Sequence, residues 1–237
     1  PKNSGAIGLQ FNASDQGCLR NLTIRSMDGA GKIGLDLGHS DEIGPLLGEN
    51  VAIDGFEIGI RTKWPVNSST FEHVTLRNQR RIGWWNYHEM IFVRDLVSEN
   101  RVPSIFNERD SWGTVTLLDA HLHATQPDAK NPAIHNQRQL YLRDVEVLGY
   151  RRAVDNDDKD RDRGDIEGPG LVKEDTSHDN VVSLFREIKD GALATAGEPI
   201  FLPVKETPVV TWGDPGTDWV NLTDFGADPT GVRDASA

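Results

Sequence analysis

The sequence has little sulfur and no long apolar segment. It contains one cysteine, Cys18, and two methionines among 237 residues, and a single cysteine excludes an intramolecular disulfide framework. No uninterrupted apolar run approaches the ~20 residues that a membrane-spanning helix needs. We therefore expect no membrane partner.

Basic residues are also few relative to acidic ones. Lys and Arg number 25 against 37 Asp and Glu, for a net charge of −12. Phosphate binding depends on clustered Lys and Arg, whereas the basic residues here are interleaved with acids, so we expect no nucleic-acid partner. The hydrophobic content of 37%, with 23 Gly and 12 Pro, is typical of a chain of many short strands and turns.

A short segment recurs six times, at intervals of 22 to 29 residues, in the form apolar, any, Asn/Asp/His, apolar, any, apolar. The copies begin at Leu19, Gly48, Phe71, Val93, Leu117 and Leu142. Each is followed by a second apolar-centred segment with strand-like alternation and no helical period between the two. Self-similarity at this spacing indicates a solenoid. Two short strands per turn predict an all-β protein with a parallel β-helix rather than a leucine-rich repeat, because the apolar positions vary freely among Leu, Val, Phe and Ile.

Stacked turns predict polar columns that have structural roles. Four asparagines fall at one place after the second strand of successive repeats: Asn86, Asn107, Asn136 and Asn156. Because neighbouring strands lie about 4.8 Å apart, we expect a ladder of side-chain amides. A second column occupies the polar position of the repeat: Asn21, Asn50, His73, Asp95, Asp119 and Asp144. These residue types commonly satisfy turn backbone.

The rest of the chain differs in character. We assign residues 1–190 to the coils of a first β-helix, with a charged loop at 155–170, and residues 191–217 to a Pro-rich linker. Asp158, Asp160 and Asp162 alternate as in a calcium loop, but the Gly falls one place late and no bidentate Glu follows at the twelfth position. Basic residues also separate these acids. We therefore predict a solvated loop and no cofactor.

The last segment, 218–237, carries a motif of known families. Its core is Asn221-Leu222-Thr223-Asp224-Phe225-Gly226-Ala227, followed by Gly231 and Arg233-Asp234-Ala235-Ser236-Ala237. This resembles the N-terminal cap of right-handed parallel β-helices of the pectate-lyase superfamily, and residues 5–156 resemble the later coils of such domains. One β-helix that ends, a linker and a second that begins resemble the tandem β-helix proteins of glycoside hydrolase family 55.

The resemblance implies a fragment of a secreted, periplasmic or cell-surface carbohydrate-active protein. Its full-length parent would hydrolyse a polysaccharide or cleave it as a lyase, with polysaccharide and the second β-helix of the same chain as partners. In the family-55 enzymes the general acid belongs to the second helix, so the catalytic centre is expected outside this fragment. The alternative is a non-catalytic carbohydrate-binding, structural or adhesion module. An acid on an early turn of the second helix, beyond Ala237, would favour the enzyme.

Two groups of outward residues are candidate sites. Trp85, Phe106 and His135 occupy the outward position of successive second strands and would form a carbohydrate-binding platform. The alternative is that loops or the second helix cover them. On the first strands, Asp119, His121 and Glu146 are candidate catalytic residues, because glycosidases need two carboxyl groups roughly 5 to 9 Å apart.

His121 and His123 alternate on one strand face, with Glu146 opposite His121. Two such histidines suit a metal ion, but the sequence indicates no clear position for a third ligand. We therefore predict no metal site.

Overall fold

The computed structural model has two units, residues 1–199 and residues 200–237, each considered by itself. In the first unit it describes residues 2–13, 16–40, 44–63, 68–109, 113–126, 130–157, 165–167 and 170–176. In the second it describes residues 205–206, 208, 220–228, 230 and 232. The Asp158, Asp160 and Asp162 group and most of the linker 191–217 lie outside the described residues.

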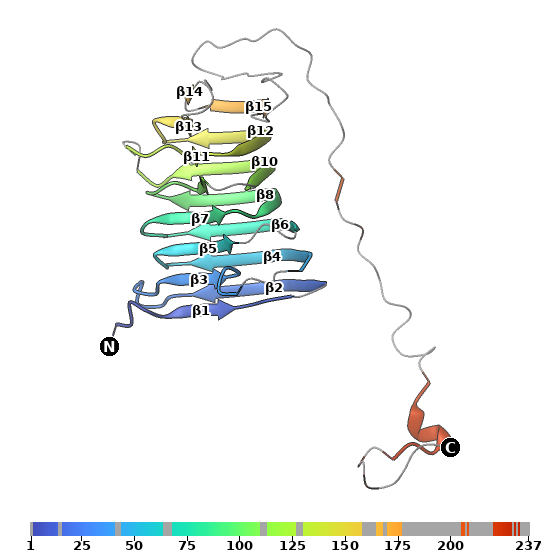
Figure 1. The fold of residues 1–237 in the computed structure, drawn as a ribbon. Helices are drawn as coiled ribbons and strands as arrows, with labels where there is room; N and C mark the ends of the chain where they lie inside the picture. The colour runs from blue at the N-terminus through green and yellow to red at the C-terminus, as the bar shows by residue number, and fades with distance from the viewer. Residues whose placement is uncertain are drawn as a thin grey trace. The chain divides into compact units, whose positions relative to one another are not determined.

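The first unit is a β-solenoid of about six turns built from two sheets (Figure 1). The eight-stranded sheet has the order β1-β3-β5-β7-β9-β11-β13-β14, and the seven-stranded sheet has the order β15-β12-β10-β8-β6-β4-β2. The first sheet comprises β1 (Ile7–Gln10), β3 (Ile33–Asp36), β5 (Ile58–Lys63), β7 (Ile82–Tyr87), β9 (Ile105–Glu108), β11 (Ile134–Asn136), β13 (Arg152–Asn156) and β14 (Ile166–Glu167). The second comprises β2 (Gly17–Arg25), β4 (Leu46–Asp54), β6 (Ser68–Arg77), β8 (Met90–Asn100), β10 (Thr114–Ala124), β12 (Gln139–Leu148) and β15 (Gly170–Thr176).

Each turn contributes one strand to each sheet, and the strands of successive turns pair in parallel. The predicted all-β parallel solenoid is thereby confirmed. Two strands that the repeat did not predict pair antiparallel at one end, β14 with β13 and β15 with β12. The one helical segment among the described residues is the 3-10 turn Leu222–Phe225. No described helix has the length and apolar character required to cross a bilayer.

Apolar side chains from both sheets fill the solenoid. Along β7 the alternation buries Trp84 completely while Trp85 stays half-buried on the outside. The Trp84 ring meets that of Phe71 from the other sheet edge to face, with centroids 4.8 Å apart and planes at 87°. Each such side chain contributes roughly 1.5–3 kcal/mol on burial. This packing holds the outward residues on a rigid frame.

The polar position of the repeat adopts a left-handed backbone in all six copies. The φ angles of Asn21, Asn50, His73, Asp95, Asp119 and Asp144 lie between 51° and 57°. In β12 the flanking inward residues Leu142 and Val145 are separated by two outward residues instead of one. This extra outward residue, which we call the bulge, lies at the same place in each stacked strand, so the register between strands is kept. Asn, Asp and His tolerate its left-handed backbone better than other side chains. The column is structural, as predicted, and its role lies in the backbone conformation.

The predicted asparagine ladder is confirmed. Asn86 donates from Nδ2 to Oδ1 of Asn107 at 3.0 Å, Asn107 donates likewise to Asn136 at 2.9 Å, and Asn136 donates to Asn156 at 2.8 Å. Thr62 extends the ladder, since its hydroxyl donates to Asn86 Oδ1 at 2.7 Å. The buried amides thereby satisfy one another from turn to turn.

Candidate functional site

The outward face of the eight-stranded sheet brings the three predicted platform residues together. The strand register pairs Arg61 with Trp85, Trp85 with Phe106, and Phe106 with His135. The Phe106 and His135 ring centroids lie 4.9 Å apart with planes tilted by 35°. All three side chains are half-buried, so each keeps part of its ring open to solvent. The face is a short column of rings along the solenoid axis.

Polar side chains border these rings. The Trp85 indole Nε1 donates to Glu108 Oε2 at 2.6 Å, and the Arg81 guanidinium carbon lies 5.5 Å from the centroid of the Trp85 ring. His135 Nε2 lies 3.8 Å from Asp157 Oδ2. The sequence signal for Glu108 was its place two residues after Phe106 on the same strand. Aromatic surface with carboxylate and guanidinium groups at its edge combines apolar contact area with polar groups that can orient a ligand.

Arg61, which the register places beside Trp85, forms an ion pair with Asp36. Arg61 donates from Nε and Nη2 to the two Asp36 oxygens, both at 2.8 Å, and the Asp36 side chain is fully buried. Asp36 Oδ1 also accepts a hydrogen bond from the Gly38 amide at 3.0 Å. Because both oxygens of Asp36 are engaged, we assign this carboxylate to positioning Arg61 beside the aromatic column.

The second candidate group lies on the outward face of the seven-stranded sheet. Glu146 Oε2 accepts hydrogen bonds from His121 Nδ1 at 3.0 Å and from His123 Nε2 at 3.2 Å. One potential ligand atom from each of the three residues lies within 4.8 Å of those of the other two. The structure thus brings together His121 and Glu146, two of the three catalytic candidates. Asp119 is exposed at the bulge and is not part of this cluster.

The charge state of Glu146 bears on its chemistry. The hydrogen bonds from His121 and His123 lower the pKa of Glu146 below its ordinary value, against a smaller opposing effect of burial. A glycosidase general acid needs a raised pKa. Glu146 therefore suits a carboxylate ligand or a base better than an acid, and its catalytic role remains a prediction.

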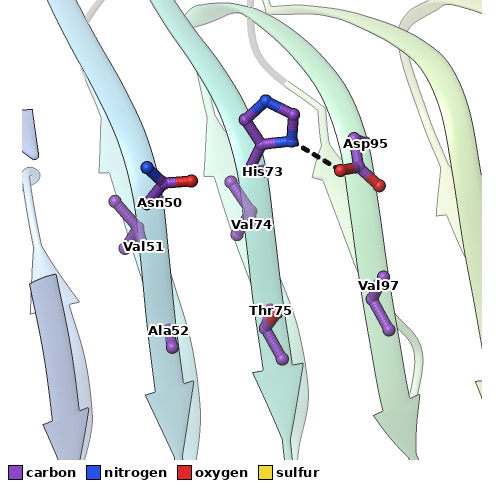
Figure 2. A pocket seen from close by; sticks show the side chains of 8 residues that line it. All are labelled: Asn50, Val51, Ala52, His73, Val74, Thr75, Asp95 and Val97. Atoms are coloured by element: carbon purple, nitrogen blue, oxygen red, sulfur yellow. Dashed lines mark hydrogen bonds and ion pairs between the residues drawn. The ribbon is translucent and has the colours of Figure 1, made fainter. Parts of the chain in front are cut away.

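A shallow depression on the same sheet surrounds a third histidine. It encloses about 260 Å³ between Asn50, His73 and Asp95 at one end and the small side chains of Ala52, Thr75 and Val97 at the other (Figure 2). The His73 Nδ1–H donates to Asp95 Oδ2 at 2.6 Å. Both residues belong to the left-handed column, where Asn50 donates to Asn21 at 3.0 Å in the same way. We therefore interpret the pair as a bond between turns.

One buried acid has a strongly altered pKa. Burial raises the pKa of Glu89 to about 9, partly offset by the Ser69 hydroxyl, which lies 3.5 Å from Oε1. The side chain is fully buried, and Oε2 has no hydrogen-bond partner within the described part of the chain. A protonated carboxyl group is what a general acid requires, but no substrate reaches this one. Nothing in the repeat pattern distinguishes Glu89 from a solvated turn residue.

No protein-family model matches this sequence, and no curated protein matches it. The resemblance to pectate-lyase-superfamily and family-55 proteins therefore remains a prediction, beyond the β-solenoid architecture itself. A fold of this kind hosts many functions. A function must be argued from the surface residues.

Proposed function

We propose that this β-solenoid binds a polysaccharide on the outward face of its eight-stranded sheet, at Trp85, Phe106 and His135. The observation that carries the proposal is the register of these three rings on consecutive strands. Flat aromatic side chains pack against the apolar faces of sugar rings. A column of them spaced by the strand separation of about 4.8 Å suits an extended chain that lies along the solenoid axis.

The neighbouring polar groups support the same ligand. The Glu108 carboxylate and the Arg81 guanidinium border the Trp85 ring, and Asp157 lies next to His135. Carboxylates accept hydrogen bonds from hydroxyl groups, and guanidinium groups donate to ring and hydroxyl oxygens. Stacking would supply the affinity and these groups the orientation.

For the whole protein, we propose a secreted or cell-surface carbohydrate-active protein, a glycoside hydrolase or a polysaccharide lyase, whose catalytic centre involves a second β-helix that begins within residues 218–237. The motif at Asn221–Ala227, similar to the start of such helices, favours this proposal. A non-catalytic binding or adhesion module is the second candidate. It is favoured by the ladder and bulge columns, which assign most repeated polar residues to structure.

Binding to soluble laminarin and pectin, measured by affinity electrophoresis and calorimetry, tests the platform. We expect Trp85→Ala to weaken binding about tenfold, which corresponds to about 1.4 kcal/mol, and Phe106→Ala to weaken it by a similar factor. Phe92→Ala is the matched control, because Phe92 is an exposed aromatic residue, at 40%, on a strand of the other sheet. Failure of the wild-type protein to bind either glycan, or equal binding by the Trp85→Ala protein, would refute the proposal.

A further inference from the structure

We propose that His121, His123 and Glu146 form a binding site for a divalent transition-metal ion of the zinc class, on the opposite sheet from the aromatic face. No step of the proposed carbohydrate binding uses these residues. The site consists of two imidazole nitrogens and one carboxylate oxygen from the adjacent strands β10 and β12.

The distances suit a metal ion. Zinc binds His nitrogen and carboxylate oxygen at about 2.0–2.2 Å, so tetrahedral ligand atoms lie about 3.4 Å from one another. Glu146 Oε2 already lies 3.0 Å from His121 Nδ1 and 3.2 Å from His123 Nε2. The three ligand atoms lie within 4.8 Å of one another, so the two imidazoles must also turn toward each other before both nitrogens reach metal-binding distance of one ion beside Oε2.

The backbone prepares this arrangement. His121 and His123 alternate with Leu122, which is fully buried, so both imidazoles must project outward from β10. The parallel register pairs His121 directly with Glu146, between the buried Val145 and Val147 of β12. The third ligand that the sequence left without a clear position is therefore supplied by strand pairing, and buried neighbours hold all three residues in place.

The donor set selects the class of ion. Two neutral imidazoles and one carboxylate suit Zn²⁺, Co²⁺, Ni²⁺ and Cu²⁺, whereas Ca²⁺ and Mg²⁺ prefer oxygen ligands alone. On the other side of His123 the register places Glu99, whose carboxylate is paired with Arg77 at 2.7 Å and so adds little net charge beside the site.

The site is open to solvent. The side chains of His121, His123 and Glu146 are 48%, 37% and 41% exposed. An ion can therefore enter directly, and its remaining coordination positions would be filled by water or by a ligand. A closed structural site would instead have four protein ligands. The ion would also connect two turns of the solenoid.

Titration of the full chain, prepared without a polyhistidine tag, with Zn²⁺ tests the site by calorimetry and by thermal unfolding. We expect one Zn²⁺ per chain and a rise in Tm with Zn²⁺ concentration, because an ion that binds the folded state stabilises it. Co²⁺ provides a second probe, since a site containing protein nitrogens changes its visible spectrum. The variants are His121→Ala with His123→Ala, and Glu146→Gln.

We expect the Zn²⁺ affinity of the double histidine variant to fall by more than about 100-fold. Loss of a residue that only hydrogen-bonds to a metal ligand lowers the affinity by roughly 10-fold to 100-fold, and loss of two ligands must cost more. The matched control is His73→Ala. It removes a histidine of the same sheet that is also hydrogen-bonded to a carboxylate, that of Asp95, but that does not belong to the three-residue cluster. Imidazole nitrogen NMR signals of the wild-type protein give a readout that needs no variant, and those of His121 and His123 should shift with Zn²⁺. Unchanged signals, or equal Zn²⁺ affinity in the double variant, would overturn the proposal.

Discussion

Replacing Glu89 with glutamine should stabilise the protein at neutral pH, by an amount that grows as the pH rises. The fully buried Glu89 carboxyl group keeps its proton up to a pKa of about 9 in the folded state, against an ordinary value of 4.5. Below pH 4.5 both the folded and the unfolded states carry this proton. Between pH 4.5 and pH 9 the unfolded chain releases it while the folded chain retains it, so the free energy of unfolding of the wild-type protein falls.

The slope of this loss is about 1.4 kcal/mol per pH unit. Relative to an uncharged side chain, Glu89 thus costs on the order of 3 kcal/mol at pH 7 and 5 kcal/mol at pH 8. Glutamine has nearly the same shape and no proton to lose. Its amide must find partners in the same pocket, where Oε2 of Glu89 has none among the described residues, but that cost does not depend on pH. The diagnostic quantity is therefore the pH slope of the difference.

Urea unfolding followed by tryptophan fluorescence, at several pH values from 5 to 8.5, measures this difference. The Glu89→Gln protein should gain stability over the wild type at each step toward higher pH. Glu57→Gln is the matched control, because Glu57 forms a surface pair with Arg81 and its side chain is 34% exposed. Such a pair contributes about 0–1 kcal/mol. A difference between Glu89→Gln and wild type that stays constant across this range would refute the reasoning.

Two further predictions concern the columns of the solenoid. Asn107→Ala should cost about 2–4 kcal/mol in urea unfolding, because it removes two buried hydrogen bonds, the one from Asn86 Nδ2 and the one to Asn136 Oδ1. Asn156→Ala, at the half-buried end of the ladder, should cost about 1 kcal/mol, and equal losses would contradict the ladder. Asp119→Val should lower the free energy of unfolding by about 1–2 kcal/mol, because a β-branched residue fits the φ of 54° poorly. Asp119→Asn should change it by less than about 0.5 kcal/mol. Similar stabilities of the two variants would argue against a backbone role for this position.

The repeat made the architecture predictable because a period of 22 to 29 residues with two apolar strands leaves few folds that bury both. Side-chain alternation likewise sufficed for Trp85, Phe106 and His135, which the register then aligned. The antiparallel strands β14 and β15 carry no repeat signal, so they were not predicted.

The buried state of Glu89 was not predictable because it depends on how the β7–β8 corner folds inward. Asn86 there donates to the Glu89 carbonyl oxygen at 2.9 Å, and the Thr114 amide donates to the same oxygen at 3.1 Å. The interval between repeats varies from 22 to 29 residues because the corners differ in length, so the repeat does not predict how a corner folds. The same holds for Arg81, which reaches the Trp85 ring from the end of the preceding turn.

The histidine cluster shows how the left-handed column determines which side chains reach solvent. In β10 the residues Val115 and Leu117 point inward, and strict alternation from them would also turn His121 and His123 inward. The left-handed Asp119 adds one residue to the outward face, so Ala120 and Leu122 become the buried pair instead. A shift of one residue moves every later side chain of a strand to the opposite face. The same bulge in β12, at Asp144, keeps Glu146 opposite His121. The proposed metal site therefore depends on two backbone bulges as much as on its three ligands, whereas the aromatic face, on strands without such a bulge, follows directly from the alternation of the sequence.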